Sequence, residues 1–204
     1  MNENSKLIEA AVEAVTLTLE NMVFEQPQLL ETSIVAPPHP KKQENRESQK
    51  SSQSYDAGEE IGLVWASIPI LAPYYGKISV VLAETFARDL AQNLYSGDDC
   101  KAHDLFLDVL AEILNTLAGR FMIALLGGVS NFEIGFPSTG KGSCDEPINP
   151  AWEGAVHADS GDGGDSRFIL LKFDISGQIF QLKIAGEDLI TMRAEMAITT
   201  ETTT

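Results

Sequence analysis

Polar and apolar residues recur with a helical period in DVLAEILNTLAG, residues 108–119. Asp108, Glu112, Asn115 and Gly119 stand at positions i, i+4, i+7 and i+11, which places them within about 60° of one another on a helix. The pattern predicts an amphipathic helix that carries a narrow polar stripe. Apolar residues occupy the opposite arc, which is roughly 120° wide at 3.6 residues per turn. They are Phe106, Leu107, Leu110, Ile113, Leu114, Leu117 and Phe121.

Two other segments show apolar spacings of three and four residues, which predict helices. The first covers about residues 5–23, with Ser5 as a suitable N-cap. The second helix is marked by Phe86, Leu90 and Leu94. Residues 97–99, Gly-Asp-Asp, are predicted to separate this second helix from the striped one and to offer N-caps. Gly127-Gly128 is predicted to end the striped helix.

Short apolar runs bounded by turn residues predict strands. Turns at residues 73–76 and 176–177 join neighbouring strands into two hairpins. Pro69 favours an edge position for its strand, or the end of that strand, because proline cannot donate to a ladder. The predicted strands are Glu31–Val35, Ile61–Leu71, Lys77–Leu82, Asn131–Phe136, Phe168–Ile175 and Gln178–Ile184.

The order of these elements predicts an α+β fold, a two-layer sandwich of helices packed on a largely antiparallel sheet. At 204 residues, a single domain over 1–204 is expected. Residues 37–60 contain almost nothing apolar, so they are predicted to be a disordered insertion within the domain. Residues 138–167 are predicted to be a polar loop, and a disordered tail is expected from about residue 197.

The charge, cysteine content and apolar runs of the chain argue against several classes of function. The formal net charge is −16, from 14 basic and 30 acidic residues, and this argues against nucleic-acid binding. Two distant cysteines without metal spacing are typical of reduced thiols in a cytosolic protein. The glutamates near the N-terminus do not fit a signal peptide. The longest strongly apolar run, Phe121–Leu126, is far shorter than the roughly 20 residues of a membrane span, so we expect a cytoplasmic protein.

Three other patterns do not support a site. Gly135–Gly142 approaches the phosphate-binding loop, but it has glycine where the magnesium-binding hydroxyl is needed, and no helical pattern follows it. Three aspartates lack the spacing of a calcium loop: Asp159, Asp162 and Asp165. The histidines lie far apart and have neither metal spacing nor a neighbouring nucleophile: His39, His103 and His157.

The polar stripe is the remaining candidate site. Acidic residues on the wet face of a helix are routine, but two of the stripe's residues need another reason. Asn115 has a poorer helix propensity than the Glu, Lys or Gln that usually fill such positions. Gly119 costs on the order of 1 kcal/mol in a helix interior, and it lies on the exposed stripe, where core packing does not explain it. Glycine there lets another backbone approach closely, which indicates a docking surface.

The motif Asp108-x3-Glu112-x2-Asn115-x3-Gly119 resembles the signature helix of the CheC/CheX/FliY chemotaxis phosphatases. These proteins dephosphorylate the response regulator CheY. The resemblance extends to the end of the first helix at Glu20-Asn-Met-Val-Phe24 and to the unit of strands and helix around residues 76–95. It also includes the strand before Pro137 and the closing hairpin. The sequence contains one copy of the Glu-x2-Asn motif. In this respect it resembles CheX, which has a single site, more than CheC, which has two.

The resemblance implies roles for these residues. Glu112 would pair with the active-site lysine of a phosphorylated CheY-like response regulator, and Asn115 would orient the water that attacks the acyl phosphate. A carboxamide is both donor and acceptor but not a useful base, which fits a positioning role. No cofactor of the chain's own is expected, since the partner would supply the phosphoaspartate and its Mg²⁺. Asp108 and Gly119 would face the partner, although we favour a merely solvating role for Asp108.

Two alternatives remain open. The first is a non-catalytic adaptor of the same fold, which binds a receiver or resembles a flagellar-switch component. The second is a structural dimer without a phosphoreceiver partner. The resemblance to CheX also implies a possible homodimer.

Overall fold

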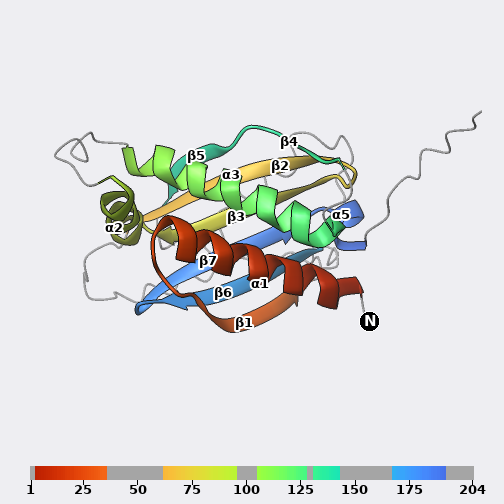
Figure 1. Cartoon of the computed structure of the whole chain (residues 1–204), viewed down its shortest axis with the longest axis horizontal. Coiled ribbons are helices and arrows are strands. Elements are labelled where there is room, and N and C mark those ends of the chain that lie inside the picture. The colour runs from red at the N-terminus through yellow and green to blue at the C-terminus, as the bar shows by residue number, and fades with distance from the viewer. Residues whose placement is uncertain (1–2, 36–61, 96–104, 128–130, 143–166, 192–204) are drawn as a thin grey trace, which may run out of the picture.

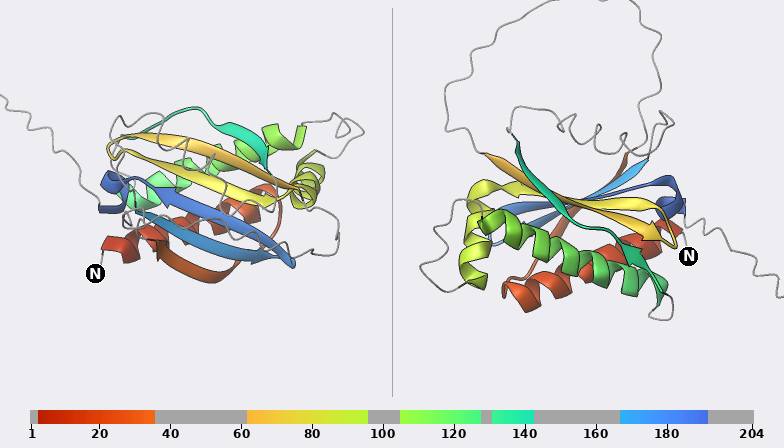
Figure 2. Two further views of the ribbon diagram at one scale, coloured as in Figure 1. Left: turned by 180° about the vertical axis from the view of Figure 1, so that it is seen from behind. Right: turned by 90° about the horizontal axis from the view of Figure 1, so that it is seen from above.

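The computed structural model describes residues 3–35, 62–95, 105–127, 131–142 and 167–191. In this part of the chain, helices pack on one seven-stranded antiparallel sheet. Figure 1 shows α1 and α3 side by side in front of the sheet, and Figure 2 shows that α1, α2 and α3 cover the same face. The predicted α+β sandwich is confirmed. The helices are α1 Glu3–Met22, α2 Glu84–Leu94, α3 Leu105–Leu126 and α5 Glu187–Thr191.

The sheet has the strand order β1-β6-β7-β3-β2-β4, and β5 also pairs with β2. Both predicted hairpins, β2–β3 and β6–β7, are confirmed by their antiparallel registers. In β6 every second side chain is buried, so that face of the strand faces the helices. The strands are β1 Gln28–Val35, β2 Leu63–Ala72, β3 Gly76–Ala83, β4 Glu133–Ile134, β5 Ser138–Gly142, β6 Phe168–Ile175 and β7 Gln178–Ala185.

The helix α3 lies at the centre of the helical layer, where it contacts α1, α2 and the strands β2, β3 and β5. Its buried arc is therefore wider than predicted. Val109, Ala118, Met122 and Leu125 are buried in addition to six of the seven predicted apolar positions, whereas Leu107 is partly exposed. A helix covered on both flanks as well as by the sheet keeps only a narrow strip for solvent. That strip contains the polar stripe and, towards the end of the helix, the exposed Ile123.

Several predictions about element ends are wrong. Ser5 lies inside α1 rather than at its N-cap, since the chain is already helical at Glu3. The Ser5 hydroxyl donates to Glu9 Oε1 at 3.2 Å, which is a side-chain pair one turn apart. Helix α5 was not predicted, because its five residues are too few for a periodic pattern. It packs its buried Leu189 and Ile190 against the end of the sheet.

Pro69 does not mark an edge or an end, because β2 continues to Ala72 and has partners on both sides. Its carbonyl accepts a hydrogen bond from Gly135 N at 2.9 Å, in the gap between β4 and β5. The nitrogen of a strand residue points to the same side as its carbonyl, so the missing donor of Pro69 falls in that gap. The predicted strand Asn131–Phe136 is correspondingly reduced to the two residues of β4.

The predicted polar loop 138–167 is wrong at its start, because Ser138–Gly142 forms β5 at the edge of the sheet. This strand carries no apolar alternation, because its sequence is Ser-Thr-Gly-Lys-Gly. A Cβ on Gly140 would lie 2.5 Å from the Trp65 ring, so the indole occupies the space that a side chain would need. Several predictions concern residues outside the described part of the chain. They are residues 143–166 of that loop, the insertion at 37–60, the tail, Gly128, the 97–99 caps, both cysteines and all the histidines.

Candidate functional site

The polar stripe of α3 has the geometry that the sequence predicts. Asp108, Glu112 and Asn115 are exposed, and Gly119 is partly exposed. Glu112 forms no ion pair with any described residue, and Asn115 makes no hydrogen bond within the described chain. A carboxylate and a carboxamide one turn apart are thus presented to solvent, where a docking partner can reach both.

Gly119 has no structural reason to be glycine. A Cβ built on it would meet no atom within 4 Å, and its backbone is not in the left-handed region. By contrast, the ring of Trp65 occupies the space where a Cβ of Gly140 would lie. The open space above Gly119 fits the prediction of a docking surface that needs close backbone approach.

The structure adds Tyr95 to this site. Tyr95 is the C-cap residue of α2, and its backbone N–H donates to Ala91 O at 3.0 Å. Its phenol donates to Glu112 Oε2 at 3.3 Å across the α2–α3 interface. The sequence pattern did not indicate this residue, because 17 positions separate it from Glu112. An aromatic residue at the end of an amphipathic helix was the available signal, and it does not identify a partner.

The environment of Tyr95 favours its neutral form. The negative charge of Glu112 raises the pKa of the Tyr95 phenol, and the hydrogen bond to that carboxylate, partial burial and the charge of Asp108 act in the same direction. Tyrosine ordinarily titrates near pH 10. The phenol therefore remains protonated, and able to donate to Glu112, throughout the physiological pH range.

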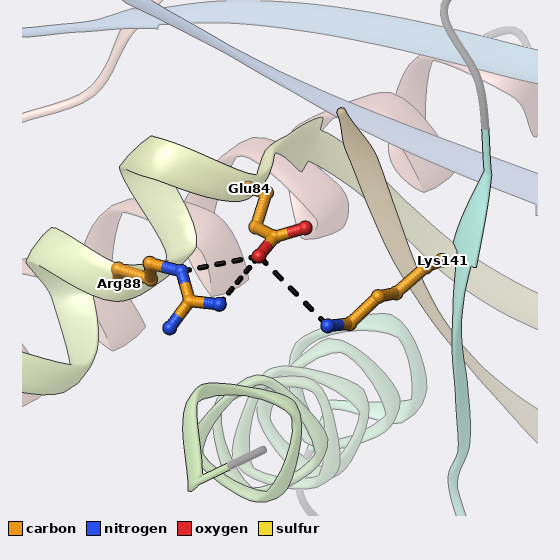
Figure 3. Close-up of polar contacts among 3 residues, drawn as sticks. All are labelled: Glu84, Arg88 and Lys141. Carbon is orange, nitrogen blue, oxygen red and sulfur yellow. Dashed lines mark hydrogen bonds and ion pairs between the residues drawn. The ribbon is translucent and has the colours of Figure 1, made fainter. Parts of the chain in front are cut away.

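A second polar cluster fixes α2 at its other end. Figure 3 shows Arg88 and Lys141 converging on the carboxylate of Glu84. Arg88 Nε lies 3.1 Å and Lys141 Nζ lies 3.8 Å from Glu84 Oε1. Both cations also lie over the ring of Phe106 in α3, at 4.2 and 5.0 Å from its centroid. The cluster connects α2, α3 and β5, so it holds the helix from which Tyr95 extends.

The backbone of this junction is also tied to the sheet. The Glu84 N–H donates to Gly62 O at 2.8 Å, just before β2. Its carboxylate, in the first turn of α2, interacts favourably with the positive end of the helix dipole. We interpret the Glu84 cluster as a structural joint, because its one carboxylate is shared by cations from α2 and β5.

Comparisons with known proteins place this geometry in a fold family. No protein-family model matches the sequence, and no curated protein matches it. Solved structures do match. CheX from Desulfovibrio desulfuricans is 16% identical, with a TM-score of 0.57 over 87% of this chain and 97% of that chain. FliY from Thermotoga maritima is 15% identical, with a TM-score of 0.57 over 93% of this chain and 92% of that chain.

The chain has the CheC/CheX/FliY fold. A third match is the CheX chain of a CheX–CheY–BeF3–Mg²⁺ complex from Borrelia burgdorferi. It is 18% identical, with a TM-score of 0.52 over 87% of this chain and 96% of that chain. In this chain the polar stripe lies on the central helix and faces away from the sheet.

By length and composition alone, α3 is long and apolar enough to cross a membrane. In this fold it is a core helix. Half of its most apolar window is buried inside the protein, and the helix exposes Asp108, Glu112 and Asn115 on its remaining surface. Among the described residues, no group of three or more His, Cys, Asp or Glu side chains is arranged to hold a metal ion.

Proposed function

We propose that this chain is a phosphatase for the phosphoaspartate of a CheY-like response regulator. The observation that carries the proposal is the exposed pair Glu112 and Asn115, one turn apart on the central helix. The CheC/CheX/FliY fold supports it, as does the CheX–CheY–BeF3–Mg²⁺ complex from Borrelia burgdorferi. Beryllium trifluoride stands in for a phosphoryl group, so that complex holds CheX together with CheY in a form that mimics the phosphorylated state.

In this proposal each residue has one role. Glu112 accepts the ammonium group of a receiver lysine and so fixes the docking geometry, because a carboxylate and an ammonium attract at short range. Asn115 holds a water in line with the phosphorus by donating to it or accepting from it. The receiver brings the phosphoaspartate and a Mg²⁺ ion, which neutralises charge on the phosphoryl oxygens. Asp108 and Gly119 border the contact.

The test is the lifetime of the phosphate on a panel of phosphorylated receivers from the same genome. We expect the wild-type chain to shorten that lifetime for one receiver. Asn115→Ala should lower the maximal rate by on the order of 10²-fold, since it loses the positioned water. Glu112→Ala should raise the half-saturating receiver concentration.

Matched controls are available on α1, where Asn21 and Glu13 are also exposed. Asn21→Ala and Glu13→Ala remove the same groups away from the stripe and should leave the rate unchanged. The proposal fails if the wild-type chain dephosphorylates no receiver faster than that receiver's own hydrolysis.

The second candidate is a non-catalytic adaptor of the same fold. It predicts that the chain binds a receiver while the phosphate lifetime is unchanged. As part of the phosphatase proposal, we also propose that the chain acts in the cytoplasm and forms a homodimer. Light scattering of the purified chain measures the oligomeric state directly.

A further inference from the structure

Glu112 is a long, exposed side chain, and its function in docking requires a defined direction. Ordering such a side chain costs up to about 2 kcal/mol of rotamer entropy. A contact that already holds the carboxylate in the unbound protein removes part of this cost before the partner arrives. The structure contains one such contact.

That contact is the hydrogen bond from the Tyr95 phenol to Glu112 Oε2 at 3.3 Å. A carboxylate has two oxygens, so a bond to Oε2 leaves Oε1 to accept a cation from outside. No described Lys or Arg forms an ion pair with Glu112. Tyr95 thus orients the group without neutralising its charge.

The helix that carries Tyr95 is itself held in place. The phenol extends from the end of α2, and the other end of that helix is tied to the sheet and to α3 by Glu84, Arg88 and Lys141 (Figure 3). A side chain on a fixed helix can hold its neighbour on α3 in one direction. Four buried residues also join α2 to the core: Phe86, Ala87, Leu90 and Ala91.

We propose that Tyr95 is a positioning residue that holds Glu112 ready for the lysine of the receiver. The inference rests on the proposed phosphatase function. It assigns Tyr95 to docking and not to the chemical step, because its hydroxyl contacts the docking carboxylate.

The test is Tyr95→Phe, which removes the hydroxyl and keeps the ring. We expect the half-saturating receiver concentration to rise about 2- to 10-fold, as for the loss of one hydrogen bond, with the maximal rate unchanged. Asn115→Ala should instead lower the maximal rate and leave the half-saturating receiver concentration unchanged. Tyr75→Phe is the matched control, since Tyr75 is an exposed tyrosine in the β2–β3 turn.

A double-mutant cycle separates action through Glu112 from direct contact with the receiver. In the Glu112→Ala background, Tyr95→Phe should have no further effect. An unchanged half-saturating concentration in Tyr95→Phe, or an equal effect in both backgrounds, overturns the assignment.

The wild-type rate tests the phosphatase function separately. If that rate equals the receiver's own hydrolysis, the same cycle is measured on the dissociation constant for a BeF3-activated receiver. The proposal for Tyr95 then stands or falls on whether its effect depends on Glu112.

Discussion

Gly119 is the residue whose identity the fold explains least. Its Cβ position is open, and its backbone is compatible with any residue. Gly119→Ala should therefore raise the free energy of unfolding by about 0.5–1 kcal/mol, because alanine loses less backbone entropy in a helix. If a receiver backbone approaches at this point, the added methyl group should also raise the half-saturating receiver concentration.

Gly127 is the matched control for this prediction. A Cβ there also meets no atom within 4 Å, but its φ is +71°. Gly127→Ala should therefore destabilise the protein by about 1 kcal/mol, since alanine is strained in the left-handed region. Urea unfolding measures both variants. A Gly119→Ala variant that is more stable and docks normally would show that Gly119 is not a clearance point.

The Tyr95 phenol makes a prediction about pH. Its pKa is raised above the ordinary value, chiefly by the charge of Glu112. The stabilisation linked to the neutral phenol is therefore fully present below about pH 10, and it is lost as the pH rises through the higher, folded-state pKa. Glu112→Gln should move the Tyr95 titration back towards its ordinary value.

The tyrosinate absorbance of the wild-type chain, minus that of Tyr95→Phe, measures this titration. The same subtraction in the Glu112→Gln background gives the comparison. An identical midpoint in both backgrounds would mean that the phenol does not sense Glu112 in solution.

At the scale of elements, the sequence predicted the helices and strands whose apolar residues recur at a regular spacing. The striped helix, α2 and both hairpins carry such periods, and all are confirmed. β5 was mistaken for a loop because an edge strand made of Ser, Thr, Gly and Lys has no apolar alternation. Its partner strand lies far away in the sequence: Gly140 pairs with Trp65, about 75 residues earlier in the chain.

The packing of β5 can be tested at Gly140, whose Cβ position is occupied by the Trp65 ring. Gly140→Val should lower the free energy of unfolding by about 1–3 kcal/mol, as overpacking does. It should also speed amide hydrogen exchange along the neighbouring part of β2. Trp65→Ala removes the obstacle, so the valine should cost less in that background. Equal costs in both backgrounds would contradict the steric explanation.

At the scale of the whole molecule, the stripe is available because every large helix covers the same face of the sheet (Figure 2). The sequence predicted that Asp108, Glu112, Asn115 and Gly119 share one helix face. It could not predict Tyr95, because the contact depends on how α2 packs against α3. Local periodicity defines the face of a helix, but the angle between two helices comes from the core.

The connection between β1 and β2 tests the prediction of a single domain with an insertion. Four antiparallel steps separate these strands, so they run parallel, and the connection must cross about 20 Å of sheet and return about 27 Å along it. Deleting residues 43–54 leaves seven residues before the cut and eight after it, between Val35 and Leu63. Such a segment reaches up to about 50 Å, which is enough.

The deletion also removes two acidic and two basic residues, Glu44, Glu47, Arg46 and Lys50, so the net charge stays at −16. If the insertion is only a connection, the free energy of unfolding should change by only about 0.5 kcal/mol, from the shorter loop to be closed. The receiver phosphate lifetime should be unchanged. A much larger loss of stability would make the segment part of the folded domain. Normal stability with an altered lifetime would instead assign the insertion a role in docking, independent of charge.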